Sequence, residues 1–278
     1  MKIIQAPRAS EILYWLLNGR ERKHLWLLPA NICQVVPLTF IKAGVPFEFV
    51  DISKATLHMD LDQAEERIMR GPFAGLLYAH TYGAPSTPDS FFSRARSLHP
   101  EMLIVDDRCL CTPEFEVSST ADVVLFSTGY AKIVDLNVGG YAFVQDNIRV
   151  QPETNVELPG WNAYRSQIEA NLESSLSQRA TLNETYASCL PSGIQLPGEF
   201  QNWRFNIRVQ NKPAVMREIF ESGLFASSHY ASLAGVMSDG RAPEAESLAS
   251  EVINLFNDHH FDSRKAERVC EIVRKHMS

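Results

Sequence analysis

The stretch FSTGYAK, residues 126–132, joins a short apolar run to a turn of small residues and ends on a single lysine. Ser127 stands five residues before Lys132, and two glycines, Gly139 and Gly140, follow the lysine. A hydroxyl that binds a phosphate and an amine that binds an aldehyde, at this spacing, predict a site for pyridoxal phosphate (PLP). The alternative is a solvated surface lysine, which is the commoner state of this residue type.

Two carboxylates upstream of this stretch support the first interpretation. The run MLIVDD, residues 102–107, is apolar until it ends in Asp106 and Asp107, as expected of a buried parallel strand. Open α/β sheets bind their ligands at the carboxyl ends of their strands. The sequence therefore predicts that Lys132 and one of the two aspartates lie at the same edge of a sheet.

Alternation of strands and helices extends this pattern over the first half of the chain. Short apolar runs predict strands at residues 25–28, 47–50, 75–78, 102–105 and 123–126, with a returning strand at 141–144. Helical periodicity is found between them, at residues 8–17, 34–43, 61–69 and 89–98, the last preceded by the capping sequence STPD at 86–89. Strand and helix in alternation favour crossover units and a mainly parallel sheet, so the predicted fold class is α/β.

The second half of the chain has a different pattern. A polar segment at 151–159 precedes a long amphipathic stretch, 167–190, that fits a helix bridging two lobes. A strand at 203–209, a helix at 213–222 and a helix at 263–276 then predict a smaller α+β lobe. We expect a large domain over residues 1–184 and a small domain over residues 185–278, which agrees with a length above that of a usual single domain.

Composition excludes several classes of protein. The formal net charge of −7 argues against a general nucleic-acid surface, and no apolar run approaches the roughly 20 residues of a membrane span. The first residues lack the apolar core of a signal peptide, so we expect a cytoplasmic protein. Five dispersed cysteines favour free thiols, and we expect no metal at the Cys109–Cys111 pair, treated as strand residues, or at His259 and His260 beside Asp258.

Six motifs in order resemble the DegT-type family of PLP-dependent sugar-nucleotide aminotransferases. They are LPANIC at 28–33, HTYG at 80–83, VDD at 105–107, the stretch 126–140 with its lysine and glycines, GWNAYR at 160–165, and SHY at 228–230. The resemblance implies a three-layer PLP-dependent transferase fold and a homodimer whose active sites take residues from both subunits. It also implies transfer of an amino group from an amino acid, such as glutamate, to a keto group of a nucleotide-linked sugar.

The resemblance also carries roles onto single residues. Lys132 matches the lysine that binds the cofactor and moves a proton, Asp107 the acid at the pyridine nitrogen, and Ser127 the phosphate-binding serine. The backbone N–H groups of Ala9 and Ser10 match the rest of the phosphate cup, where the family's glycine is missing and Arg8 adds a charge.

Further positions match the family outside this central set. Asn162 matches an asparagine that reaches the phosphate of the neighbouring subunit, with Ala163 as an extra residue in the motif. His229 and Tyr230 match a motif near the substrate channel, although a packed structural pair is an equal alternative. His80 and Tyr82 match a strand-end motif that shapes the site.

Several positions depart from the family pattern. Cys33 stands where many members carry an aromatic residue against the cofactor ring, Leu110 where they have Gln or His, and Val138 where they have a glutamate. These departures keep two alternatives open: a PLP enzyme with a non-sugar substrate, and a non-catalytic descendant with a binding or regulatory role. The sequence assigns no ligand to Arg165, Arg204 or Arg208.

Overall fold

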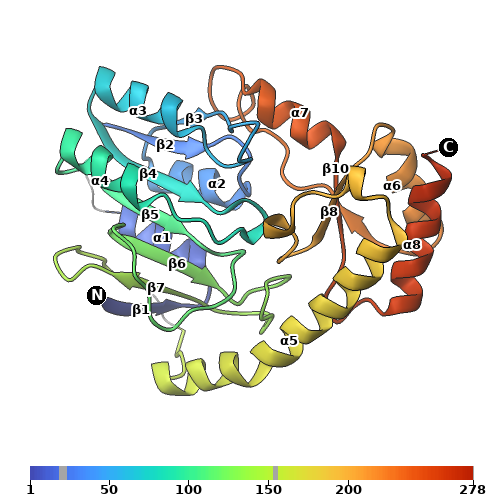
Figure 1. The fold of residues 1–278 in the computed structure, drawn as a ribbon. Coiled ribbons are helices and arrows are strands. Elements are labelled where there is room, and N and C mark those ends of the chain that lie inside the picture. Colours follow the sequence, from blue (N-terminus) through green and yellow to red (C-terminus); the bar gives the residue numbers. More distant parts are fainter. Residues whose placement is uncertain (19–23, 153–155, 278) are drawn as a thin grey trace.

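The computed structural model describes residues 1–18, 24–152 and 156–277, and its centre is a sheet of seven strands in the order β1-β7-β6-β5-β4-β2-β3 (Figure 1). The strands are β1 (Lys2–Ala6), β2 (Leu25–Pro29), β3 (Phe47–Val50), β4 (Phe73–Ala79), β5 (Leu103–Asp107), β6 (Val123–Ser127) and β7 (Gly140–Val144). Strands β2 to β6 are parallel, and β7 is antiparallel to both of its neighbours. The predicted α/β class with a mainly parallel sheet is confirmed.

Helices cover both faces of this sheet because its strands are apolar on both sides. Helices α1 (Ala9–Leu17) and α2 (Val35–Ala43) pack on one face, and α3 (Leu61–Arg70) and α4 (Asp89–Leu98) pack on the other. Alternate residues of one strand separate accordingly: Val105 joins the core under α1 and α2, whereas Ile104 joins the core under α3 and α4. The same alternation decides which way the two carboxylates of β5 point.

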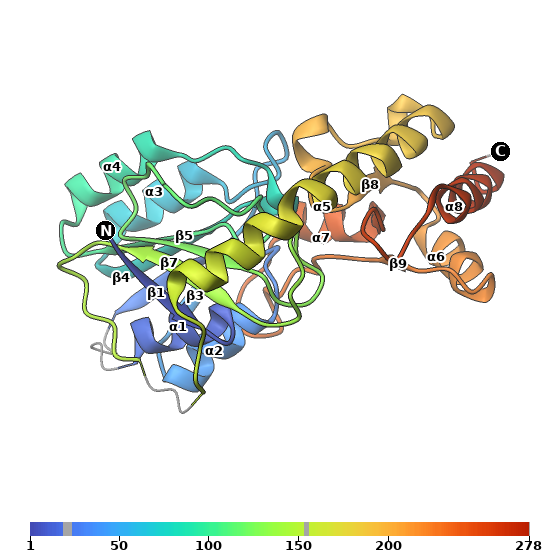
Figure 2. The ribbon, with the colours of Figure 1, turned by 90° about the horizontal axis from the view of Figure 1, so that it is seen from below.

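Helix α5 (Trp161–Cys189) runs from the large sheet to a smaller lobe (Figure 2). That lobe contains a three-stranded antiparallel sheet in the order β8-β10-β9, covered by further helices. Its elements are β8 (Phe205–Arg208), α6 (Lys212–Glu221), β9 (Ala226–Ser227), α7 (Pro243–Glu251), β10 (Val252–Leu255) and α8 (Ser263–Lys275). The end of α5 contributes Leu182 and Tyr186 to the core of this lobe, so our proposed division at residue 184 falls within one continuous helix.

Helix α7 connects the small lobe back to the large one. Asp51, which follows β3, accepts hydrogen bonds from the backbone N–H groups of Glu244 and Ala245 in the first turn of α7, both at 2.9 Å. A carboxylate at a helix N-terminus satisfies N–H groups that have no partner within the helix. Ala245 and Leu248 pack in the core of the large sheet, so α7 belongs in space to both lobes.

Three local expectations are corrected by the structure. The sequence at 86–89 does not cap α4: the N-cap residue is Pro88 without a side-chain hydrogen bond, because Thr87 accepts from Arg108 and the Asp89 carboxylate binds the Thr120 backbone N–H. Helix α5 begins at Trp161, six residues before the predicted start. Cys109 and Cys111 lie in the loop after β5 and not on a strand.

All five cysteines are free, as expected. Within the described residues, no helix is both long and apolar enough to cross a membrane.

Candidate functional site

The end of β6 and the start of α1 lie close together on either side of Gly140. Ser127, the last residue of β6, pairs with Gly140, and a side chain at Gly140 would lie 2.3 Å from the backbone nitrogen of Ala9. The N-cap residue of α1, Arg8, makes no side-chain capping hydrogen bond. The first N–H groups of a helix, left without a cap and placed beside a hydroxyl, bind phosphate groups. The structure thus brings Ser127, Ala9 and Ser10 to one place.

We predict that Gly140→Ala pushes β7 and the start of α1 apart and lowers the stability of the fold, because the added methyl group meets the backbone of α1 and not a flexible side chain. Overpacking of this kind costs about 1–3 kcal/mol of unfolding free energy, measured by chemical denaturation. Gly129→Ala is the matched control, since its added carbon would have only Ser127 Oγ as a neighbour, at 3.5 Å. Equal stability of the two variants would contradict the close approach of β7 and α1.

Asp106 and Asp107 point to opposite faces of the sheet. Asp106 is fully buried, with Oδ1 at 2.7 Å from His80 Nε2 and Oδ2 at 2.9 Å from Arg108 Nε. Asp107 lies on the side of α1 and α2, where its Oδ1 accepts the backbone N–H of Cys109 at 2.9 Å. Asp106 is therefore bound to two internal charged groups, whereas the carboxylate of Asp107 is bonded to the backbone N–H and the thiol of Cys109.

The backbone around Lys132 is held in a fixed turn. Ala131 has a φ of +60°, and its N–H donates to the Asp135 carboxylate at 2.7 Å. The buried Arg179 of α5 donates to the carbonyl oxygen of Lys132 at 2.9 Å and to Asn257 Oδ1 at 2.7 Å. Since a positive φ is strained for alanine, these contacts are what maintain the turn that positions the lysine.

Electrostatics relate Lys132 to Asp107. Burial raises the pKa of the Cys109 thiol well above its usual range, the charge of Asp107 raises it further, and the amine of Lys132 lowers it. Desolvation and the charges of Arg204 and Lys132 lower the pKa of His229. The amine of Lys132 thus acts on the Cys109 thiol, on which Asp107 also acts, and on the His229 ring.

Aromatic side chains of the small lobe contact the large domain near Lys132. Trp203 stacks on Tyr230 with ring centroids 6.3 Å apart and donates from Nε1 to the carbonyl oxygen of Ala131 at 2.6 Å. The Tyr82 hydroxyl donates to the carbonyl oxygen of His229 at 2.7 Å. Burial raises the pKa of Tyr230 well above its usual range, and the charges of Cys33 and Asp107 raise it further. Cys33, Asp107 and Tyr230 are therefore neighbours.

Asn162 is the predicted site residue that lies apart from this group. It is exposed at the start of α5, where the neighbouring Tyr164 hydroxyl is 2.6 Å from Thr128 Oγ1. Leu110 and Val138 contribute no polar group: Leu110 is buried in the core under α1 and α2, and Val138 is exposed.

Sequence reasoning missed two residues of the site, Trp203 and Arg179. Trp203 had a signal only as part of an expected strand, and Arg179 had none, because its partners at residues 132, 203 and 257 are distant in the chain. Arg204, left unassigned from the sequence, is buried and forms an ion pair with Asp258 at 2.8 Å.

Of two polar pockets, one lies beside Lys132 and the other lies away from it. One, of about 410 Å³, lies beside Lys132 and is lined by α5 and by the loop that carries His259. There Asp258, His259 and His260 bring possible ligand atoms within 4.8 Å of one another, but Asp258 already binds Arg204.

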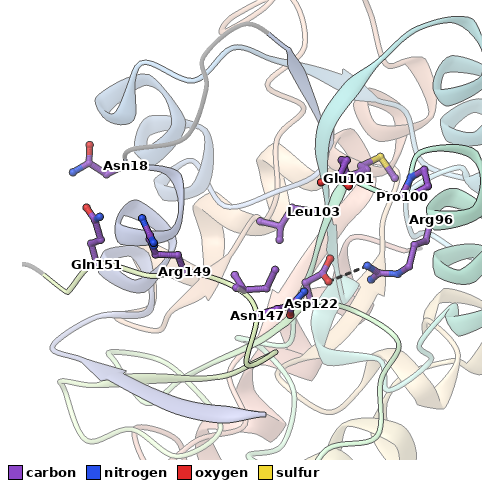
Figure 3. A pocket seen from close by; sticks show the side chains of 11 residues that line it. Asn18, Arg96, Pro100, Glu101, Leu103, Asp122, Asn147, Arg149 and Gln151 are labelled. Carbon is purple, nitrogen blue, oxygen red and sulfur yellow. Dashed lines mark hydrogen bonds and ion pairs between the residues drawn. The ribbon is translucent and has the colours of Figure 1, made fainter.

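The second pocket, of about 400 Å³, lies where β5 begins, at the other end of the strand from Asp107 (Figure 3). Its Arg96 is engaged by Asp122 at 3.0 Å and by the carbonyl oxygen of Thr120 at 2.9 Å. This guanidinium therefore ties α4 to the start of β6, and the pocket is separate from the group around Lys132.

Comparisons with known proteins establish the fold. No protein-family model and no curated protein matches the sequence. Among solved structures, the chain is similar to a DegT DnrJ EryC1 StrS aminotransferase from Brucella abortus, with a TM-score of 0.78 and 16% identity over 100% of this chain and 87% of the other. It is similar to a protein described as a sugar aminotransferase, Spr1654 from Streptococcus pneumoniae, in its PMP form, with a TM-score of 0.79 and 16% identity over 99% and 87% of the two chains.

A third structure, the aminotransferase TlmJ from Streptoalloteichus hindustanus, has a TM-score of 0.80 and 19% identity over 99% and 85% of the two chains. The chain thus has the three-layer fold of these aminotransferases. The expected fold is confirmed over nearly the whole length of the chain.

Proposed function

We propose that this protein is a PLP-dependent aminotransferase of the DegT type. The observation that carries the proposal is that the amine of Lys132 and the carboxylate of Asp107 both act on the Cys109 thiol. Ser127 ends the neighbouring strand β6, and its pairing partner Gly140 lies against the start of α1. The fold shared with solved aminotransferases supports this assignment, since sites of α/β sheets lie at that edge.

The residues present fit the cofactor. Ser127 and the N–H groups of Ala9 and Ser10 would hold its phosphate, because a hydroxyl and uncapped helix N–H groups meet there. Asp107 would bind the pyridine nitrogen through its second oxygen. Cys33 would contact the face of the ring, where a polarisable thiol packs well against an aromatic system.

PLP, when bound, supplies an electron sink that makes a proton on the substrate carbon removable. The residues of the chain would bind and orient the cofactor and the substrate, and they would move that proton. Lys132 would carry the proton as acid and base, since its amine acts on the Cys109 thiol, on which Asp107 also acts, and on the His229 ring. The carboxylate of Asp107 would face the pyridine nitrogen, and Arg179 would hold the lysine backbone in place.

The proposed substrates are an amino-acid donor, glutamate in the first instance, and a keto group on a nucleotide-linked sugar. The neighbours described as sugar aminotransferases support a sugar acceptor. We further propose a cytoplasmic homodimer without nucleic-acid or membrane partners, in which exposed Asn162 reaches the cofactor phosphate of the other subunit, and His229 and Tyr230 line the substrate channel. The mass of the purified protein in solution tests the dimer.

A second candidate is a descendant that binds the cofactor without amino transfer, or acts on a non-sugar substrate. It is favoured by Cys33, Leu110 and Val138, which leave the site without an aromatic ring stacker, an amide and a carboxylate.

The visible absorption spectrum of the protein incubated with PLP separates these candidates. We expect a yellow band that forms with the wild-type protein, because the amine of Lys132 would bind the aldehyde, and that is lost on addition of L-glutamate, because the amino group of glutamate would pass to the cofactor and the keto acid would leave. A band that persists with glutamate and with a panel of other amino acids favours the binding protein. The absence of any band removes the proposed function.

A further inference from the structure

Two buried histidines, His80 and His58, lie side by side behind the candidate site, with ring centroids 6.2 Å apart. Both ring nitrogens of His80 face acceptors: Nε2 is 2.7 Å from Asp106 Oδ1, and Nδ1 is 2.6 Å from the carbonyl oxygen of Ala84. A carbonyl oxygen only accepts, so Nδ1 must carry a proton. The charge on His80 then depends on whether the second proton is on Nε2 or on Asp106.

The surroundings of Asp106 place that proton on His80. Oδ2 of Asp106 accepts from Arg108 Nε at 2.9 Å and from the Ser119 hydroxyl at 3.4 Å. A guanidinium at hydrogen-bond distance favours the ionised form of a carboxyl group. The charge of Arg108 is itself balanced by Glu114, whose two carboxylate oxygens accept from Arg108 Nη1 at 3.0 and 3.1 Å. Asp106 is thus an anion between two cations.

His58 has the opposite state. Its Nδ1 accepts the backbone N–H of Thr81 at 3.2 Å, so this nitrogen carries no proton and the ring is neutral. A neutral ring beside His80 avoids the repulsion of two buried imidazolium groups. Hydrogen-bond geometry therefore assigns one charged and one neutral histidine to the pair.

The charged histidine is joined to Asp107 through the backbone. The N–H of His80 donates to the carbonyl oxygen of Asp107 at 3.2 Å, while its ring holds Asp106, the preceding residue. On the other side, the N–H of Arg108 donates to the carbonyl oxygen of Leu125 at 2.8 Å. The end of β5 is therefore held at residues 106, 107 and 108, and the direction of the Asp107 carboxylate is fixed.

We infer that His80 is a positioning residue that is protonated at neutral pH, whose imidazolium, held between Asp106 and Ala84, fixes the end of β5 so that Asp107 faces the cofactor. The inference rests on the proposed function for its consequence, but the charged state of His80 is a property of the protein alone. His80 of the HTYG motif would thus have a role beyond shaping the site.

The titration of the pair follows from these contacts. Burial by itself lowers the pKa of His80, but its hydrogen bonds to Asp106 and Cys111 and their charges raise it to about 10. Burial and the charge of His80 lower the pKa of His58 to about 4. The other ionisable groups that face His80 come from β4 and from the loop after β5; they are Tyr78, Arg108 and Cys111.

The sign of the pH dependence differs for the two rings. The pKa of His80 is raised on folding, so its stabilising contribution is complete below about pH 6.5 and is lost as the pH rises through about 10. The pKa of His58 is lowered on folding, so its neutral ring begins to cost stability below about pH 6.5, and this cost is complete below about pH 4.

The test is ¹⁵N NMR of cofactor-free protein labelled at histidine, with His80→Gln to assign the signal. We expect both ring nitrogens of His80 to be protonated at pH 8, and the stability difference between wild type and His80→Gln to shrink between pH 6.5 and 10. His99→Gln is the control, since the half-buried ring of His99 bonds to the carbonyl oxygen of Ile68 and to no carboxylate among the described residues. A His80 ring that is neutral at pH 8 would overturn the inference, whatever the protein does with PLP.

The positioning task has a separate readout. The Gln amide of His80→Gln keeps a donor for Asp106 but carries no charge, so we expect PLP affinity to fall by roughly tenfold, as when an outer partner of a ligand is removed. Affinity unchanged from wild type would show that His80 does not position Asp107. A wild-type protein that binds no PLP would remove the proposed function and leave the NMR result intact.

Discussion

Replacing Lys132 with alanine is expected to abolish amino transfer and the visible band formed with PLP. The loss of the acid and base alone costs about 10²- to 10⁴-fold in rate, and loss of the covalent attachment adds to it. The fold should survive, because the turn at Lys132 is held by backbone contacts: Arg179 binds the carbonyl oxygen of Lys132, and Asp135 binds the N–H of Ala131. Single-turnover kinetics with glutamate and the absorption spectrum measure the two effects.

Lys132→Arg and Lys54→Ala are the controls for this variant. Arginine keeps the positive charge but does not attach to the aldehyde at neutral pH, so it should lose the band as alanine does. Lys54 is an exposed lysine in the turn before α3, and its removal should leave the spectrum unchanged. An intact band in Lys132→Ala would transfer the attachment to another amine and contradict the assignment.

Replacing Asp107 with asparagine is the second large effect that we expect. The amide oxygen still accepts the N–H of Cys109, so the loop keeps its structure, but the negative charge opposite the pyridine nitrogen is lost. We expect a fall in transfer rate of about 10²-fold or more, since charge stabilisation by one well-placed group is worth roughly this much. The measurement is the rate of loss of the visible band with glutamate.

Asp106→Asn is the matched variant one residue away, and its effect should be on stability. It leaves His80 and Arg108 without their shared anion in a fully buried position, which costs about 3–5 kcal/mol of unfolding free energy. The two variants should therefore separate: one loses rate and keeps stability, and the other loses stability. If Asp106→Asn folds normally and loses the rate, the roles of the two carboxylates are exchanged.

Much of the large domain could be predicted from the sequence, because its strands are short apolar runs bounded by helices with clear periodicity. Residues 47–50 and 89–98 coincide with β3 and α4, and the returning strand at 141–144 is antiparallel β7. The position of Asp107 and Ser127 at the carboxyl ends of neighbouring parallel strands followed from the predicted order of strands. Their grouping with Lys132 in one cofactor site stays a prediction. Local signals were sufficient wherever the structure is built from local contacts.

The remainder depends on contacts between distant residues. Strand β1 at the amino terminus and helix α7 had no distinctive periodicity, and they are stabilised by β7 and by Asp51 respectively. The pairing of His80 with Asp106, and of Arg179 with Lys132, joins residues 26 and 47 positions apart. No pattern of single residues contains such pairs, because they arise only when the chain has folded.

Helix α5 has a mechanical consequence. Its 29 residues extend about 44 Å as one continuous helix. Arg179 of this helix donates hydrogen bonds to the carbonyl oxygen of Lys132 in one lobe and to Asn257 in the other. A rotation of the small lobe would therefore displace the backbone of Lys132 through the single guanidinium of Arg179. The relative position of the two lobes and the direction of the lysine amine are thus mechanically coupled.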